Sequence, residues 1–383
     1  MTTPLPCQRA LFDIPDDIAY FNTAFMSPLL KAAASAGRQA MEMKMHPWLC
    51  SSDDFFTQVG RPRRLFASVI NADADDIAII PAASYGIAVA ARNLPVAKGQ
   101  VILVLRDQFP SNVYSWQRLA EETGATIETV EPPTDGDWSA AMLARIEELG
   151  DRLAITACQH CHWTDGALID LRAVSDATHA AGAALVVDLT QSIAAIPFDV
   201  EEIKPDFMVA AGYKWMLGPY GYGFMYVAPK WQEGVPLEEN WINRAGSEDF
   251  SQLVNYQHDY QPGARRYDMG ERAQFQLAPV VVAALEQLLD WEVPRIAASL
   301  KQMTDRIADH AQALGLGVRP AHLRSPHMIG LTFPDGLPRD LPARLAESEI
   351  HVSARGNAMR ISPHLHISEM DMARLLDGLK KSL

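Results

Sequence analysis

The sequence contains few cysteines and little of the charge that nucleic-acid binding requires. Four cysteines occur in 383 residues, at positions 7, 50, 158 and 161, which is too few for the disulfide framework of a secreted protein. Lys and Arg number 33 against 47 Asp and Glu, giving a formal net charge of -14. This is the wrong sign for a surface that binds phosphate backbones, so no nucleic-acid partner is expected.

Long apolar runs are missing as well. No segment is long enough without charge to span a bilayer, and Met1–Pro6 has neither the basic nor the apolar stretch of a secretory signal. We therefore expect a cytoplasmic protein without a membrane partner. Because 48% of the residues are hydrophobic, the chain can bury the core of two domains, or of one large domain with a smaller lobe.

One short motif has the appearance of a metal or haem site. Cys158–His162 reads C-x-x-C-H, the pattern of c-type haem attachment, and its composition also suits zinc. It directly follows the apolar run Leu153–Ala157, and no second cysteine pair completes a site. We expect neither haem nor a metal there.

The pattern from residue 75 onward predicts an α/β fold. Apolar runs alternate with helix-like stretches that end at glycines. The expected strands are 77–80, 101–105, 126–130, 153–157, 184–187, 207–210 and 223–227, and the expected helices between them include 87–93, 116–123, 139–149 and 171–181. A short loop with Gly218 and Gly221 joins the last two strands, which predicts one antiparallel excursion in a large mixed, mostly parallel sheet flanked by helices.

The pattern of predicted helices and strands changes near residue 280. Two long helical stretches, 279–291 and 295–314, are followed by short strand-like pieces at 329–333 and 359–362 and a helix from Glu369. This predicts a smaller α+β lobe. We assign 21–279 to a large domain, and 1–20 with 280–383 to a small one.

An acid and a lysine follow two of the predicted strands. Asp188 comes directly after 184–187, at the strand end where α/β sheets bind ligands. Lys214 follows 207–210 between Tyr213 and Trp215, which should desolvate the amine, lower its pKa and favour Schiff-base chemistry. The simpler alternatives are a turn acid and a surface lysine.

Two further strand ends carry a helix start and an aromatic ring. Ala83 and Ser84 open the helix before Ile87, which suits a phosphate, although a plain helix cap would look the same. Phe109 follows 101–105 and could stack on a flat ligand or belong to the core. A phosphate cradle, a ring, an acid and an amine together are what pyridoxal 5'-phosphate needs, because the acid keeps the pyridine nitrogen protonated and the ring can accept electrons.

The sequence resembles the class V aminotransferase family of fold type I pyridoxal-phosphate enzymes, which includes cysteine desulfurases, kynureninases and isopenicillin N epimerases. The likeness covers nearly the whole chain. It rests on Tyr20–Ala24, Ser84–Gly86, Asp188–Gln191, Gly212–Gly221 and Pro262–Tyr267.

The resemblance implies roles for individual residues. Lys214 would hold the cofactor as an internal aldimine, Asp188 would face the pyridine nitrogen, and Gln191 would donate to the phenolic oxygen. The cofactor-binding set that the resemblance implies is Ala83, Ser84, Phe109, Asn112, Asp188, Gln191, Tyr213, Lys214 and Trp241. Trp241 resembles the tryptophan that kynureninases send across a homodimer interface to the neighbour's phosphate, and the alternative is an interface aromatic without cofactor contact.

The small lobe would supply the substrate contacts. Arg360 aligns with the arginine that grips the substrate α-carboxylate in the family, a task that suits a bidentate guanidinium, and Asn22 joins it in the implied substrate site. His351, His364 and His366 lie near the expected mouth, where they would serve as acid or base or be ordinary surface histidines.

The sequence differs from the family pattern at two places, and these differences reduce the number of activities to consider. Residues 351–358 contain no cysteine, and because persulfide chemistry needs a thiolate, desulfuration is rejected as the main activity. Gln191 stands where kynureninases usually have histidine. The expected function is transamination of a small amino acid or amine through an external aldimine in a homodimer. Kynureninase-like or C–S lyase cleavage is the alternative, and a catalytically idle cofactor-binding module is a third hypothesis.

Overall fold

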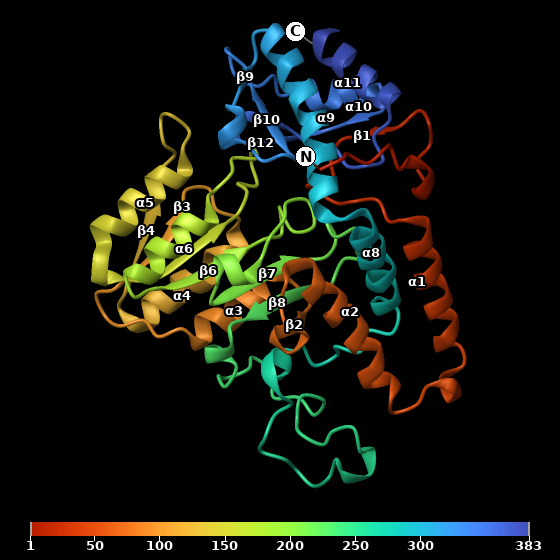
Figure 1. The fold of residues 1–383 in the computed structure, drawn as a ribbon, viewed down its shortest axis with the longest axis vertical. Coiled ribbons are helices and arrows are strands. Elements are labelled where there is room, and N and C mark those ends of the chain that lie inside the picture. The colour runs from red at the N-terminus through yellow and green to blue at the C-terminus, as the bar shows by residue number, and fades with distance from the viewer. Residues whose placement is uncertain (1, 382–383) are drawn as a thin grey trace.

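The large lobe is built on one seven-stranded sheet in the computed structural model of the chain, which describes residues 2–381 (Figure 1). In order across the sheet the strands are β2 (Ile77–Ile80), β8 (Gly223–Val227), β7 (Phe207–Ala211), β6 (Ala184–Asp188), β5 (Leu153–Gln159), β3 (Val101–Leu105) and β4 (Thr126–Val130). β8 is antiparallel to both neighbours, and all other neighbouring pairs are parallel. The predicted mixed, mostly parallel sheet is confirmed, with its antiparallel strand after the Gly218–Gly221 loop.

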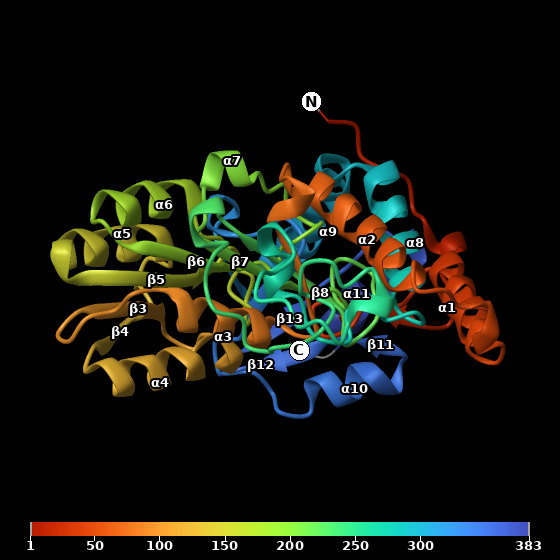
Figure 2. The ribbon, with the colours of Figure 1, turned by 90° about the horizontal axis from the view of Figure 1, so that it is seen from below.

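Helices cover both faces of this sheet, which explains why most of its strands are continuously apolar. Figure 2 shows α5 (Trp138–Leu149) and α6 (Leu171–Ala180) on one face, and α3 (Ala83–Asn93) and α4 (Tyr114–Thr123) on the other. α4 ends at Gly124 in the left-handed conformation (φ 74°), where a side chain would be strained. The short helix α7 (Val200–Ile203) precedes β7.

Three helices pack together at the β2 end of the sheet. α8 (Ala278–Trp291) packs against α1 (Lys31–Lys44) and α2 (Asp54–Ile70). The buried residues of α8 belong to the apolar cluster of the large lobe, whereas the small lobe has its own cluster from Ile307 onward, within α9 (Val293–Ala313). The assignment of 280–383 to the small domain stays a prediction, but α8 itself packs with the large lobe.

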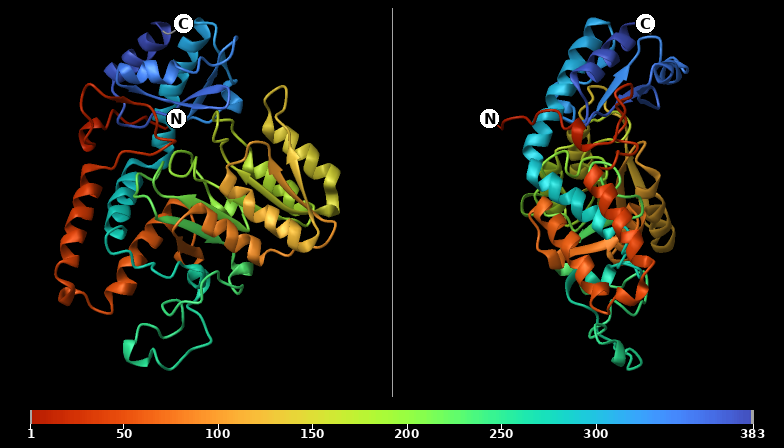
Figure 3. Two further views of the ribbon diagram at one scale, coloured as in Figure 1. Left: turned by 180° about the vertical axis from the view of Figure 1, so that it is seen from behind. Right: turned by 90° about the vertical axis from the view of Figure 1, so that its right-hand side faces the viewer.

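The small lobe is a four-stranded antiparallel sheet with helices, which gives it the expected α+β character. Its strands are, in order, β12 (Ser353–Arg355), β13 (Ala358–Ile361), β10 (Ile329–Thr332) and β9 (Gly317–Val318), and its other helices are α10 (Leu341–Glu347) and α11 (Glu369–Lys381). β1 (Ala19–Tyr20) pairs in parallel with β11 (Ile350–His351), so the N-terminal segment lies against this lobe, as Figure 3 shows from behind.

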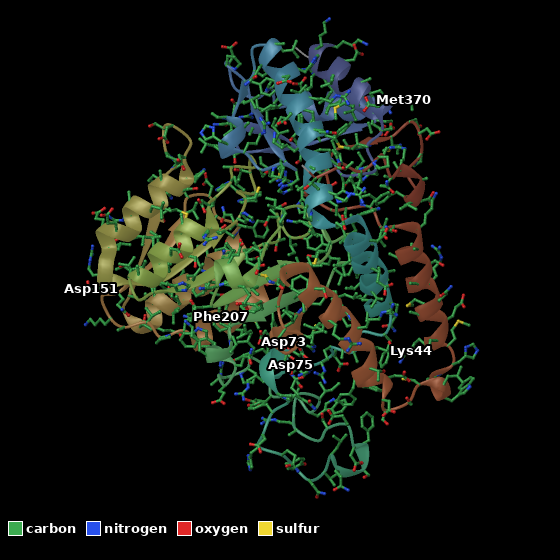
Figure 4. The ribbon with its side chains drawn as sticks, viewed as in Figure 1. Lys44, Asp73, Asp75, Asp151, Phe207 and Met370 are labelled. Carbon is green, nitrogen blue, oxygen red and sulfur yellow. The ribbon has the colours of Figure 1, made fainter. Side chains whose placement is uncertain are left out.

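A long connection between β8 and α8 projects from the large lobe at the end remote from the small lobe (Figure 1). Figure 4 labels Lys44 at the end of α1 toward this side, and Met370 at the opposite end of the molecule. No helix within residues 2–381 is long and apolar enough to cross a membrane.

Candidate active site

A cavity opens at the carboxyl-end edge of the sheet, where β2, β3, β5, β6 and β7 all end. This is the position at which open α/β sheets bind ligands. The cavity is lined by Pro81, Ala82, Ala83, Ser84, Gln108, Phe109, Ser111, Gln159, Cys161, Trp163, Asp188, Thr190, Gln191, Ala211, Tyr213, Lys214, Tyr220, Gly221 and Tyr222. The four strand-end groups singled out in the sequence are therefore brought to one place.

The lysine and the acid are both buried in this cavity. Asp188 is the last residue of β6 and is 7% exposed, and Lys214 is 6% exposed. Burial lowers the pKa of Lys214 to about 8, although the charge of Asp188 opposes this shift. Burial raises the pKa of Asp188, while hydrogen bonds from Thr190 and the charge of Lys214 favour its ionised form. The desolvation expected from the aromatic neighbours of Lys214 is thus present.

The loop that carries Lys214 is closed on itself. The amide of Gly212 donates to Tyr222 O (2.9 Å), and the amide of Gly218 donates to Gly212 O (2.9 Å). A Cβ at Gly212 would lie 2.5 Å from Tyr222 O, so only glycine lets the two ends of the loop approach this closely. The lysine is therefore held on a fixed turn directly after β7.

The N-terminus of α3 faces the same cavity. Ala82 is its N-cap and provides no side-chain cap. The Tyr85 amide donates to Ala82 O (3.1 Å), which leaves the amides of Ala83 and Ser84 for a ligand beside the Ser84 hydroxyl. Gly86 lets the helix lie close to the sheet, because a Cβ there would be 2.5 Å from Cγ1 of Val209 on β7. Backbone amides and a helix dipole at this point favour an anion.

Aromatic rings border the lysine. The ammonium of Lys214 lies 5.6 Å from the Phe109 ring centroid and 5.5 Å from that of Tyr213. Phe109 is 38% exposed and makes an edge contact with Trp163, at 5.5 Å between centroids. Because one face of this region opens to the cavity, Phe109 is available to stack on a flat ligand.

Comparisons with known proteins agree with this geometry. Residues 42–375 match the family described as Aminotransferase class-V. The chain belongs to the class-V aminotransferase family. It is 28% identical over 321 residues to an uncharacterized aminotransferase, YcbU, of Bacillus subtilis, covering 83% of this chain and 82% of that protein. It is also 26% identical over 313 residues to a kynureninase of Deinococcus radiodurans, covering 79% of this chain and 73% of the relative.

A solved structure shows the same fold. The apo structure of a cysteine desulfurase from Thermococcus onnurineus superimposes with a TM-score of 0.83 over 99% of this chain and 98% of that chain, at 17% sequence identity. At this identity the likeness concerns the fold alone. The fold type I architecture predicted from the sequence is confirmed.

The cofactor of the class-V aminotransferase family is pyridoxal 5'-phosphate, and the residues of the cavity fit it. A buried amine, a buried acid, an aromatic ring and the N-terminus of α3 all line one cavity, and these are the groups that a Schiff base, a pyridine nitrogen, a flat ring and a phosphate require. The partly deprotonated lysine matches the chemistry of an aldehyde cofactor, since only the neutral amine attacks a carbonyl.

Gln191 lies in the cavity but its amide is already engaged. Its Oε1 accepts from Trp215 Nε1 (3.1 Å), and its Nε2 donates to Ala24 O (3.0 Å). One proton on Nε2 remains for a ligand, so the predicted donation to the phenolic oxygen stays a prediction. Thr190 beside it was not predicted, and its Oγ1 accepts from the Ala211 amide (3.1 Å).

Two predicted cofactor residues do not line the cavity. Asn112 is fully buried, and its Oδ1 accepts from Trp116 Nε1 (3.0 Å) inside the large lobe. Its Nδ2 is buried without a hydrogen-bond partner within residues 2–381, so the predicted bond near the phenolic oxygen stays a prediction. Trp241 lies in an aromatic group with Phe55 and Phe250, away from the cavity of its own chain.

The predicted substrate residues, Arg360 and Asn22, are not among the residues that line the cavity, but Arg360 contacts its wall through Trp163. Nη1 of Arg360 on β13 donates to Trp163 O (2.7 Å), and its Nη2 is buried without a hydrogen-bond partner within the described residues. Asn22 bridges to Ser362, just after β13, and its Oδ1 likewise finds no partner among residues 2–381. An unsatisfied buried guanidinium nitrogen is costly unless a ligand completes it.

The sequence analysis placed His364 and His366 near the mouth of the cavity, but the structure places them in the core. His364 and His366 are fully buried beneath Trp215, Trp291 and Phe12. Burial lowers their pKa values, that of His366 to about 4. Both are therefore neutral near pH 7. They lie in the core because the chain after β13 turns into the junction between the lobes. His351 on β11 is half-buried and pairs with Glu349.

The C-x-x-C-H motif belongs to the core and to the cavity wall. Cys158 lies on β5 and Cys161 just after it, both are buried, and burial raises the pKa of each thiol to about 12. Cys161 lines the cavity as a thiol and not as a thiolate.

Sequence reasoning missed several cavity residues, of which Trp163 and Gln159 are the most informative. Gln159 ends β5 opposite Asp188 in the sheet register, so the rule that located Asp188 would also have found it. Trp163 had no local signal. Its loop is held by the small lobe, through Arg360 and through an Arg319–Asp165 ion pair (2.6 Å).

Proposed function

We propose that this enzyme transfers the amino group of a small amino acid, with Lys214 as the residue that binds the cofactor and moves the substrate proton. The observation that supports this proposal most is the buried amine of Lys214, which shares one cavity with Asp188 and the uncapped N-terminus of α3. Pyridoxal phosphate, when bound, supplies an aldehyde and a ring that accepts electrons from bonds at the α-carbon.

Each residue has a defined task in this proposal. Asp188 holds a proton on the pyridine nitrogen, and the α3 amides with Ser84 hold the phosphate. Arg360 binds the substrate carboxylate through its unpaired Nη2, beside Asn22. With the substrate in place, the amine of Lys214, whose pKa is lowered to about 8, would take the α-proton as a general base.

Two observations favour transfer over cleavage. The relative YcbU is described as an aminotransferase and matches most of both chains. Persulfide formation has no support, because residues 351–358 contain no cysteine and the Cys161 thiol in the cavity has its pKa raised to about 12. Kynureninase-like cleavage remains the second candidate, favoured by the kynureninase relative and by Tyr213 directly before the lysine.

A single-turnover experiment separates the two. The cofactor-loaded protein is mixed with a panel of amino acids without any amino acceptor, and the products are identified by mass spectrometry. Transfer predicts stoichiometric keto acid with the carbon skeleton intact, and no product from Lys214→Ala. Release of a side-chain fragment together with alanine or pyruvate would contradict transfer and support cleavage.

We also propose that the active unit is a homodimer. Large apolar side chains are exposed at one end of the large lobe, on η2 (Pro47–Leu49), near the end of α1 and on the projecting loop: Met41, Met45, Trp48, Leu49, Trp241, Phe250, Val254 and Tyr256. Exposed apolar area of this kind marks an interface. We propose that a second copy of the chain covers these side chains. Trp241 is predicted to contact a phosphate, but it does not reach the cavity of its own chain.

A further inference from the structure

Two arginines share one face of the small-lobe sheet. In the antiparallel pairing of β12 with β13, Ser353 is opposite Arg360 and Arg355 is opposite Ala358. Opposed residues point to the same side of a sheet, as do residues two apart on a strand. Arg355 and Arg360 are therefore diagonal neighbours, and both side chains are directed to the same side.

That side is the active-site side, because both arginines contact Trp163. Arg360 donates to its carbonyl oxygen (2.7 Å), and the guanidinium carbon of Arg355 lies 5.9 Å from the centroid of its indole ring. Trp163 itself lines the cavity. The charges of both arginines act on Lys214, where they favour the neutral amine.

The charges around the substrate side of the cavity do not balance. The charges of Arg355 and Arg360 act on Lys214, although neither arginine is among the residues that line the cavity. Among the described residues that line it, Asp188 is the one with a carboxylate. Neither arginine forms an ion pair within residues 2–381. Arg355, which is half-buried, makes one hydrogen bond, to the carbonyl of its neighbour Ala354. Partly desolvated guanidinium groups without an anion are costly, so such a pair is a ready anion site.

We infer that Arg355 selects substrates with a second acidic group, so that the enzyme acts on short amino acids whose side chain ends in a carboxylate or a similar oxyanion. The inference rests on the proposed function, in which the α-carboxylate occupies Arg360. With that charge matched, Arg355 is the cation left for the side chain. Diagonal neighbours in an antiparallel pair lie about 7–8 Å apart. Two arginines at this separation have flexible side chains, so their guanidinium groups can bind the two carboxylates of one molecule when two or three carbons separate those carboxylates.

The test compares acids of equal length on the cofactor-loaded protein. Succinate and glutarate carry two carboxylates, and butyrate and pentanoate carry one. Binding is followed through the absorbance of the cofactor. Wild type should bind the dicarboxylates about tenfold more tightly, as expected for one added charge-assisted hydrogen-bonded pair. Arg355→Met should remove this preference and leave the affinity for the monocarboxylates unchanged.

Two control variants separate the possible outcomes. Arg339→Met removes an exposed arginine of the same lobe and should preserve the preference, which excludes a general charge effect. Arg360→Met should weaken both classes of acid. The inference is overturned if wild type binds both classes equally, or if Arg355→Met weakens both alike. If Arg360→Met changes nothing, or no acid binds at all, the proposed substrate site itself is wrong and the inference falls with it.

Discussion

At the scale of single residues, the state of Lys214 links the stability of the protein to its chemistry. A buried amine whose pKa is lowered to about 8 binds its proton less tightly in the folded chain than in the unfolded chain. The cofactor-free protein therefore carries an energetic cost at neutral pH, and that cost is relieved as the pH rises from about 8 toward the ordinary value of lysine. The same shift provides neutral amine for reaction with the cofactor.

Lys214→Met tests this directly, because methionine fills similar space without a charge. At pH 7 the cofactor-free variant should be more stable than the cofactor-free wild type by about 3 kcal/mol, the energy that corresponds to the lowered pKa. Above pH 8 the difference should shrink, since the wild type gains stability as the unfolded chain retains the extra proton. Urea unfolding across this pH range measures it. A difference that does not depend on pH would contradict the account.

Some residues of the candidate site could be predicted from the sequence, and others could not. Lys214, Asp188, Ser84 and Phe109 could be predicted because each follows an apolar strand, and the ends of parallel strands meet at one edge. The direction of the Asn112 side chain could not be predicted, because it depends on a turn that brings its Oδ1 to Trp116.

At the scale of elements, the approach of α3 to the sheet sets the position of the expected phosphate site. Gly86 is the contact point, since any side chain there would collide with Val209 on β7. The alternation of apolar strands with glycine-ended helices made the sheet predictable almost to the residue. The small edge strands β9 and β12 were not predictable, because two or three residues carry no periodicity and form only by pairing.

Gly86→Ala should therefore weaken cofactor binding. The new Cβ forces α3 away from β7, and we expect about tenfold lower affinity for pyridoxal phosphate, from roughly 1–3 kcal/mol of overpacking. Fluorescence titration of the cofactor-free protein measures this affinity. Val209→Ala removes the colliding Cγ1, so the double variant should recover most of the loss. Equal affinities of the single variant and wild type would show that α3 is not positioned by this contact.

At the scale of the whole molecule, the arrangement of the lobes determines what the site contains. The small lobe supplies Arg360 and holds the Trp163 loop, and the buried histidines pack beneath the junction. None of these contacts has a local signature in the sequence, since each joins segments far apart in the chain. The family resemblance supplied Arg360. His364 and His366, which the sequence analysis placed near the mouth of the site, are buried in the structure.

Mixing two inactive variants tests the proposed homodimer. If Trp241 of one chain completes the site of the other, Trp241→Ala and Lys214→Ala should each lose activity alone. After joint refolding, one site of each mixed dimer has both wild-type residues, so activity should return to about a quarter of the wild-type level. Each variant refolded by itself is the matched control. No recovery in mixtures shown by mass spectrometry to contain mixed dimers would exclude a role of Trp241 across the interface.

The most direct measurement is to identify the residue to which the cofactor is attached. The protein is saturated with pyridoxal phosphate, reduced with borohydride, digested and mapped by mass spectrometry. The account predicts that the modified peptide carries the cofactor on Lys214, and that Lys214→Ala carries none. A map in which Lys214 is unmodified while another lysine carries the cofactor would contradict it.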